Sequence, residues 1–196
     1  MKTIEIRKCR KNEIDITADL YIRTVDEMIG TGTNYPKWRR DYPDRQSVVS
    51  AFESGSQYIC LADGVIAGAF VLNEDPAGAY EKGDWEKTLS RGEYLIIHTL
   101  AVSSSFRGMG IGAGMTEFCI ETAESGGYKA VRLDIVPENL PAEKLYRKMG
   151  FKFAGQKDLE RGIDDIPEFK LFEYNLPGDN DLSVDTRTSQ LRVSEQ

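Results

Sequence analysis

The chain has 196 residues, of which 40% are hydrophobic and 29% are charged. This composition is ordinary for a globular protein and excludes wholesale disorder, a collagen-like fibre and a bundle of membrane helices. The 25 basic and 32 acidic residues give a net charge of −7, which argues against a nucleic-acid partner bound through the field of the whole protein.

Cysteine and histidine are too sparse to predict a disulfide framework or a metal site. Cys9, Cys60 and Cys119 are widely spaced and form no C-x-x-C pair, and His98 is the only histidine in the sequence. This usage favours a reducing compartment, and we expect a cytoplasmic protein. The first residues lack the apolar core of a signal peptide, and no apolar stretch approaches the length of a membrane span, so no membrane partner is expected.

The first half of the chain predicts one strand and two helices. Residues 3–7 favour a strand. Apolar residues then recur at the spacing of one helix face, with Asn12 as the expected cap and Gly30 at the expected end. Asp44 is expected to cap a second helix, which Gly55 closes. The residues of the first helical face are Ile14, Ala18, Tyr21, Val25 and Met28.

A hairpin and a long strand follow. Asp63-Gly64 joins two apolar runs and is a strong signal for a two-residue turn, so residues 57–73 predict a β-hairpin. Residues 76–91 are polar and predict a loop with a short helix. Residues 93–102 are almost continuously apolar, which is typical of a strand covered on both faces.

The second half alternates helices with strands and then changes in composition. The expected elements are a turn over 103–110, a helix from 111 to 125, a strand over 130–136, a helix over 141–149 and strands over 151–156 and 168–175. Residues 1–176 are therefore expected to form one domain. Residues 177–196 are polar and are expected to form a flexible tail, with an arm exchanged onto a partner subunit as the alternative.

The turn between residues 103 and 110 carries the first pattern that points to chemistry. A glycine-rich turn at a helix start leaves backbone N–H groups free for a phosphate, and the helix dipole adds about half a positive charge there. No Gly-Lys pair exists for a nucleotide P-loop, and the dinucleotide pattern G-x-G-x-x-G fails at Ala113 and Met115. The pattern that fits is Arg107-x-x-Gly110-x-Gly112.

This pattern resembles the pyrophosphate signature of the GNAT-type, acetyl-CoA-dependent N-acetyltransferase superfamily. A second block downstream, N-x-x-A-x-x-x-Y-x-x-x-G-F, is similar to the same family in order and spacing. The resemblance covers roughly residues 3–176 and is sharp over residues 93–153. The second block reads Asn139, Ala142, Tyr146, Gly150 and Phe151 in this chain.

The resemblance implies a fold and a co-substrate. The implied GNAT fold is an α/β (α+β) architecture, with a mixed, mostly antiparallel twisted sheet of about seven strands and helices on both faces. The implied co-substrate is acetyl-CoA, with no metal. The residues that the resemblance places at the cofactor are Leu100, Ala101, Val102, Arg107, Gly108, Met109, Gly110, Ile111, Gly112, Asn139, Ala142 and Tyr146.

Two residues are candidates for catalysis. The resemblance places Tyr146 near the thioester sulfur, where its hydroxyl can protonate the leaving thiolate. His98 matches the offset of a histidine in serotonin-type N-acetyltransferases, and we expect it to take a proton from the acceptor amine, directly or through water. The alternatives are that Tyr146 is a core aromatic residue and that His98 is a satisfied core histidine.

The acceptor site is expected to use two aromatic loops. Trp38, Tyr42 and Trp85 are candidate walls, together with Tyr35 and Tyr80, because aromatic rings can hold apolar or cationic groups. The alternative is that these side chains clamp the loops onto the sheet. Asp134 is a candidate partner for a cationic acceptor, or a solubilising residue at a strand end.

These expectations favour an enzyme that transfers the acetyl group of acetyl-CoA to a primary amine of a small molecule, an amino acid or a peptide. The amine attacks directly in a ternary complex. The alternatives are a non-catalytic acyl-CoA sensor of the same fold and a regulator that binds nucleotides. The resemblance also implies a capacity to form homodimers. The acceptor is not identified, because one fold serves many acceptors.

Overall fold

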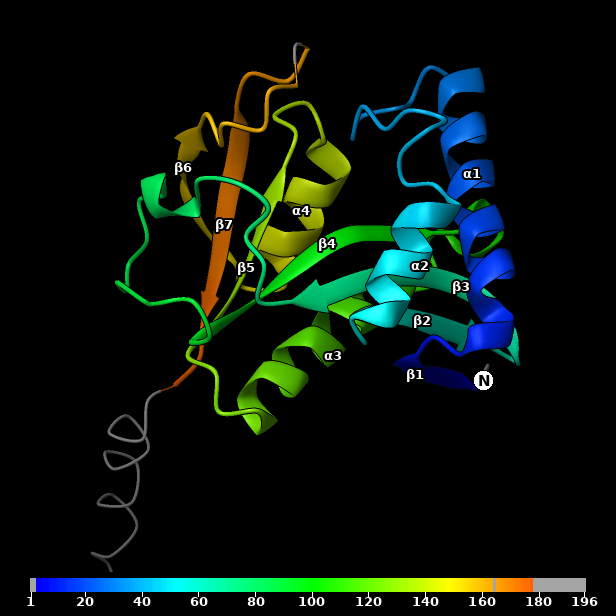
Figure 1. Cartoon of the computed structure of the whole chain (residues 1–196), viewed down its shortest axis with the longest axis horizontal. Helices are drawn as coiled ribbons and strands as arrows, with labels where there is room; N and C mark the ends of the chain where they lie inside the picture. The colour runs from blue at the N-terminus through cyan, green and yellow to red at the C-terminus, as the bar shows by residue number, and fades with distance from the viewer. Residues whose placement is uncertain (1–2, 164, 178–196) are drawn as a thin grey trace, which may run out of the picture.

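Residues 3–163 and 165–177 are described by the computed structural model, and their strands form a single mixed sheet in the order β1-β2-β3-β4-β5-β7-β6 (Figure 1). All neighbouring strands are antiparallel except β4 and β5, which run parallel. The predicted fold is therefore confirmed. The strands are β1 (Ile4–Lys8), β2 (Gln57–Ala62), β3 (Val65–Asn73), β4 (Tyr94–Val102), β5 (Ala130–Ile135), β6 (Lys152–Lys157) and β7 (Phe169–Asn175).

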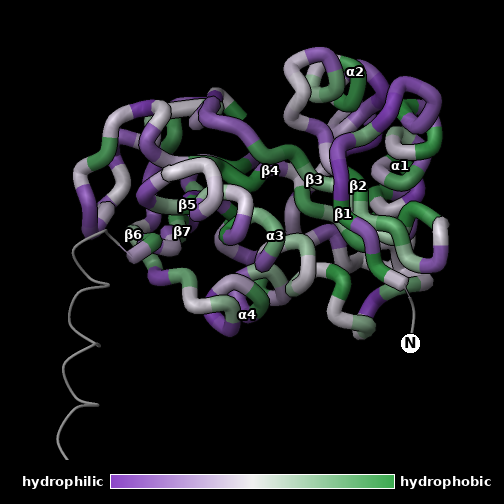
Figure 2. Tube along the Cα trace, turned by 90° about the horizontal axis from the view of Figure 1, so that it is seen from below, coloured by the Kyte–Doolittle hydropathy of each residue, from purple (hydrophilic) through white to green (hydrophobic). Residues whose placement is uncertain are grey.

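Helices cover both faces of the sheet. One buried cluster joins the sheet to α3 and α4, and a second cluster joins the other face to α1 and α2. In Figure 2 the hydrophobic colour follows the central strands, while the hydrophilic colour dominates the connecting loops. The helices are α1 (Ile14–Gly30), α2 (Arg45–Glu53), α3 (Ile111–Ser125) and α4 (Leu140–Lys148), and short 3-10 turns cover Lys11–Glu13, Tyr80–Lys82 and Ser104–Phe106.

The predicted start of α1 is wrong. Asn12 does not cap the helix but lies inside the preceding 3-10 turn, and α1 begins at Ile14. The carboxylate of Glu13 accepts a 2.8 Å hydrogen bond from the backbone N–H of Arg10 and forms a 2.7 Å ion pair with Arg7. This acidic side chain holds the chain in the extra turn, so that the helix starts later than the local cap signal indicates.

Other local predictions are confirmed by the backbone. The carboxylate of Asp44 caps α2 by accepting a 2.8 Å hydrogen bond from the backbone N–H of Ser47. Asp63 and Gly64 have φ values of 51° and 78°, which are the left-handed conformations that a tight hairpin turn between β2 and β3 requires. The predicted tail beyond residue 177 lies outside the described residues.

A β-bulge in β4 interrupts its pairing with β3 and creates space for a binding site. Ala69 pairs with Ala101 and Val71 pairs with His98, so one residue of β3 faces two residues of β4. Thr99 lies in this bulge and has a φ of 47°. The parallel pairing of β4 with β5 ends at Ile97. The two central strands therefore separate beyond this point, and bulges of this kind often lie beside active sites.

An ion pair is buried at the other end of β5. Arg132 and Glu173 are each 2% exposed, and Arg132 Nη2 lies 3.8 Å from Glu173 Oε2. The guanidinium lies between two aromatic rings, 4.1 Å from the ring centre of Trp85 and 4.2 Å from that of Tyr94. These contacts join the loop that carries Trp85 to the sheet.

Substitution of Glu173 by glutamine should destabilise the protein by about 3 kcal/mol, because Arg132 then remains as a buried charge without its counter-ion. Unfolding in denaturant, followed by circular dichroism, measures this change. The control is Glu86→Gln, since Glu86 forms an exposed pair with Lys152 and should have little effect. Equal stability of the Glu173→Gln variant and the unmodified protein would show that the pair does not hold this loop.

Candidate active site

A cavity of about 460 Å³ lies where β4 and β5 separate. Its lining combines the bulged part of β4, the end of β5, α4 and two loops that follow α1 and β6. Ile97 belongs to the cluster beneath α3 and α4, whereas Ile96 belongs to a third buried cluster, which it shares with Tyr80 and Leu159. Because side chains alternate along a strand, His98 shares the face of Ile96. The cavity thus joins the two faces of the sheet through the gap between the strands.

The glycine turn before α3 offers free backbone donors. Gly108 and Gly110 have φ values of 75° and 81°, and Gly110 is the residue that caps the helix. Within the described part of the chain, no hydrogen bond uses the N–H groups of Gly110, Ile111 and Gly112. These groups belong to the first turn of the helix, where no carbonyl of the helix can accept them. The turn is therefore suited to bind an anion.

The other predicted cofactor residues lie around the same end of the sheet. Leu100 is in the bulge and lines the cavity, while Ala101 and Val102 continue β4 toward the glycine turn. A Cβ placed on Gly112 would lie 3.3 Å from the side chain of Leu145 and 3.7 Å from that of Val102. The absence of a side chain at Gly112 thus keeps α3 close to α4 and β4. Arg107 and Met109 are exposed.

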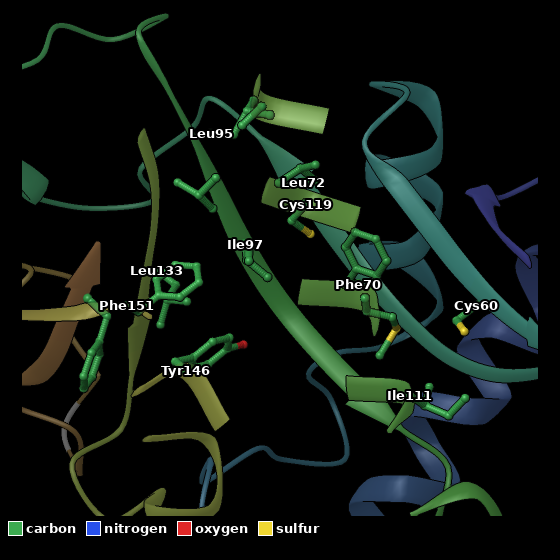
Figure 3. Close-up of a cluster of buried hydrophobic side chains, with 14 of the residues drawn as sticks. Cys60, Phe70, Leu72, Leu95, Ile97, Ile111, Cys119, Leu133, Tyr146 and Phe151 are labelled. Atoms are coloured by element: carbon green, nitrogen blue, oxygen red, sulfur yellow. The ribbon is translucent and has the colours of Figure 1, made fainter. Parts of the chain in front are cut away.

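Tyr146 approaches the cavity from α4. Its side chain is 5% exposed, and its ring packs against Phe151 with 5.5 Å between the ring centres. Figure 3 shows the hydroxyl directed toward β4. Among the described residues, none forms a hydrogen bond with this hydroxyl. Burial raises the pKa of Tyr146 well above its usual value, so the hydroxyl stays protonated and available as a donor.

Two further predicted cofactor residues stand at the start of α4. Asn139 caps the helix, because its Oδ1 accepts a 3.3 Å hydrogen bond from the backbone N–H of Ala142. Asn139 and Ala142 both line the cavity. With Oδ1 used as the cap, the amide nitrogen of Asn139 remains as a donor for a ligand.

His98 is held at the edge of the bulge. Its Nε2 lies 3.1 Å from Oδ1 of Asn73, which also accepts a 2.9 Å hydrogen bond from the backbone N–H of Asp75. Burial lowers the pKa of His98, and the nearby carboxylates of Asp134 and Asp75 only partly oppose this shift. The imidazole is therefore neutral near pH 7 and can accept a proton.

Asp134 lines the cavity but is already engaged. Arg161 donates two hydrogen bonds to its oxygens, at 2.7 and 2.8 Å, and the hydroxyl of Tyr80 donates a third at 2.6 Å. The structure therefore gives Asp134 the role of an anchor for the loop that carries Arg161. Sequence reasoning missed Arg161, which lies in a loop without a recognisable motif.

Of Trp38, Tyr42 and Trp85, which are predicted to form walls of the acceptor site, two line the cavity and one does not. Trp38 and Tyr42 line the cavity, and Trp38 packs edge-on against Tyr21 with 6.1 Å between the ring centres. Trp85 is not in the lining. It lies over the buried Arg132 and donates a 2.6 Å hydrogen bond to the carbonyl of Tyr80, as expected from the alternative that aromatic residues clamp a loop.

Within residues 3–163 and 165–177, every helix is too short or too polar to span a lipid bilayer. No group of three or more His, Cys, Asp or Glu side chains in these ranges is arranged to hold a metal ion.

Comparisons with known proteins identify relatives. Residues 24–151 match the model of the acetyltransferase (GNAT) family. The N-acetyltransferase YesJ of Bacillus subtilis, itself uncharacterized, is 26% identical over 161 residues, which are 80% of this chain and 82% of YesJ.

Solved structures show the same fold. A GNAT-family acetyltransferase from Streptococcus agalactiae superposes with a TM-score of 0.70 at 21% identity, over 89% of this chain and 96% of that one. The protein yncA of Salmonella typhimurium, solved with its cofactor acetyl-CoA, has a TM-score of 0.64 at 16% identity, over 89% of this chain and 94% of its own.

Proposed function

Because the chain belongs to the GNAT acetyltransferase family, we propose that it is an N-acetyltransferase that moves the acetyl group of acetyl-CoA to a primary amine. The observation that carries this proposal is the opening between β4 and β5, which Tyr146 and His98 line, together with the free backbone N–H groups of the glycine turn that follows β4. A small molecule, an amino acid or a peptide can supply the amine.

The residues at the opening fit coenzyme A. The free N–H groups of Gly110, Ile111 and Gly112 suit its pyrophosphate, and Arg107, which forms no ion pair among the described residues, can add a positive charge. The bulged part of β4 and the side chain of Asn139 suit the amide-bearing pantetheine arm. The presence of acetyl-CoA in the structure of yncA, which shares the fold, supports this co-substrate.

The acceptor must reach the thioester as a free amine. A primary amine with a pKa of about 10.4 is mostly protonated near neutral pH. We assign the removal of this proton to His98, directly or through water, because its imidazole is neutral and lines the cavity. The bound acetyl-CoA supplies an activated carbonyl, which the free amine attacks directly in a ternary complex.

The hydroxyl of Tyr146 is assigned to the leaving sulfur. A thiol has an ordinary pKa of about 8.5, and a buried slot raises it, as it raises that of Tyr146. The hydroxyl can therefore donate a hydrogen bond, and finally a proton, to the sulfur as negative charge develops there. Cys119 is unsuited to carry the acetyl group, because it is fully buried and burial raises the pKa of its thiol.

The presence of both groups favours an enzyme over the alternative of an acyl-CoA sensor. A sensor needs the glycine turn and the slot, but it needs neither a buried tyrosine hydroxyl without a partner nor a neutral histidine on the acceptor side. Release of free thiol from acetyl-CoA in the presence of primary amines is the direct test. Binding of acetyl-CoA without thiol release for any amine would favour the sensor.

Gly110→Ala should weaken acetyl-CoA binding about tenfold, because alanine is strained at a φ of 81° and would shift the free N–H groups. Titration calorimetry measures the affinity. The matched control is Gly127→Ala at the opposite end of α3, where φ is 74° and the added Cβ is equally free of contacts. Equal affinity of both variants and the unmodified protein would contradict the assignment of the pyrophosphate to this turn.

A further inference from the structure

A second cavity, of about 270 Å³, lies beside the first on the face of the sheet covered by α1 and α2. The two cavities share Tyr42, Ala77, His98 and Thr99 in their linings. His98 therefore stands at the boundary between them. An acceptor whose amine lies beside His98 has room to extend into the second cavity, away from the slot between β4 and β5.

The second cavity presents oxygen atoms whose hydrogens are used elsewhere. The hydroxyl of Ser47 donates to the carboxylate of Asp44 at 2.6 Å. The hydroxyls of Ser54 and Ser56 lie 2.7 Å apart and each lies 3.1 Å from the carbonyl oxygen of Ala51, so one hydroxyl donates to the other and the second donates to this carbonyl. Each of these serines lines the cavity. The lone pairs that remain can accept hydrogen bonds from a ligand.

An amide continues this pattern. The side-chain nitrogen of Gln57 donates to the carbonyls of Tyr58 and Phe70, both at 3.0 Å, which leaves its Oε1 as an acceptor. Gln57 is 2% exposed and lines the same cavity. The second cavity thus offers several oxygen acceptors to the N–H groups of a ligand, and the hydroxyl of Ser50 and the amide nitrogen of Asn73 remain as donors beside them.

The charged residues of the lining also favour a ligand that carries a positive charge. Asp75 is its only acidic residue, and no lysine or arginine lies in it within the described ranges. Arg91 approaches Asp75 only to 3.8 Å, and both side chains are about two-thirds exposed, so this pair neutralises the carboxylate weakly. By contrast, Lys37, Arg39 and Arg161 all line the first cavity.

We propose that the second cavity binds a positively charged group of the acceptor, and that the preferred acceptor is a diamine. One amine lies beside His98 and receives the acetyl group, while the second, as an ammonium ion, donates hydrogen bonds to the oxygen-lined cavity near Asp75. This inference rests on the proposed function, because it names the class of amine that the same site selects.

Other acceptor tails fit the second cavity less well. A carboxylate would be repelled by the negative charge of Asp75 and by the lone pairs of the serine and glutamine oxygens. An alkyl tail would remove water from the serine and glutamine oxygens and offer no hydrogen bond in return. An ammonium ion satisfies these oxygens and is also attracted by a protein with a net charge of −7.

Binding of matched amines tests this proposal without turnover. Putrescine and cadaverine are compared by titration calorimetry with n-pentylamine and n-hexylamine, which replace one ammonium group by methyl, and with ε-aminocaproate, which ends in a carboxylate. We expect at least one diamine to bind about tenfold more tightly than its matched monoamine, and ε-aminocaproate to bind most weakly. Monoamines that bind as tightly as both diamines would overturn the proposal.

Asp75→Asn locates the interaction. This variant should reduce the preference for the diamine about fivefold, the upper range for a partly exposed ion pair. The matched control is Asp19→Asn on α1, since Asp19 is also exposed, also lies 3.8 Å from an arginine and lines neither cavity. An unchanged preference in Asp75→Asn, or an equal loss in Asp19→Asn, would place the second ammonium elsewhere.

Ser50→Lys provides an independent test, because lysine is well tolerated on a helix and brings its own ammonium group to the lining. The variant should bind diamines at least fivefold less tightly and should lose less affinity for monoamines. Thiol release from acetyl-CoA is measured separately. If diamines bind preferentially but no amine releases thiol, the proposed function fails while the charge preference of the cavity stands. If all amines are acetylated and bound equally, only the present inference fails.

Discussion

Tyr146→Phe is expected to lower kcat about a hundredfold, within the usual range for the loss of a general acid. The substitution removes only the hydroxyl, and the packing of the ring against Phe151 remains. Acetyl-CoA should bind with nearly unchanged affinity, because the glycine turn is intact. Steady-state kinetics of thiol release, together with calorimetry of acetyl-CoA binding, separate these two quantities.

The matched control for this variant is Tyr174→Phe. Tyr174 also packs against Phe151, with 5.6 Å between the ring centres, and it does not line the cavity. Loss of its hydroxyl should leave kcat unchanged. If Tyr146→Phe retained the full kcat, or if both variants lost activity equally, the hydroxyl of Tyr146 would have no role at the sulfur.

His98→Gln is expected to lower kcat/KM for the acceptor about a hundredfold and to change its pH dependence. Burial lowers the pKa of His98 from its ordinary value of 6.5. The imidazole thus remains unprotonated down to a pH below 6.5, and activity is lost as the pH falls through the lowered pKa. Glutamine does not titrate, so this acidic limb should be missing in the variant.

The pH profile must be separated from the titration of the acceptor itself. Rates are therefore expressed per concentration of unprotonated amine between pH 5 and pH 8, a range about the ordinary pKa of histidine. The affinity for acetyl-CoA serves as the control for folding and should match that of the unmodified protein. An acidic limb that persists in His98→Gln would assign the titration to a different group.

Much of the fold could be predicted from the sequence because its signals are local. The Asp63-Gly64 turn, the Asp44 cap and the glycine turn before α3 each depend on a few adjacent residues, and the backbone has the expected conformation at all three places. The predicted start of α1 was wrong because Glu13 forms an ion pair with Arg7 on β1. Rules that consider only adjacent residues do not include such a contact.

The walls of the candidate site were harder to predict than the two residues proposed for catalysis. Tyr146 and His98 lie on elements whose period fixes their direction, so a motif could locate them. Trp85 and Arg161 lie in long loops, where the position of a side chain depends on distant partners: Arg132 for the first and Asp134 for the second. Neither partnership has a sequence spacing that could reveal it.

The hydrogen bonds between Arg161 and Asp134 have a consequence for the proposed selection of an amine. The loop that carries Arg161 is held to β5 in the absence of an acceptor. The entropy cost of ordering this loop is therefore part of folding and does not reduce the free energy of acceptor binding. Selection among acceptors would then depend on the shape of a preformed wall rather than on a mobile loop that closes over the bound acceptor. In the proposed reaction, such a preformed wall would exclude amines of the wrong shape at first contact, and the acetylated product would leave without the reopening of a loop.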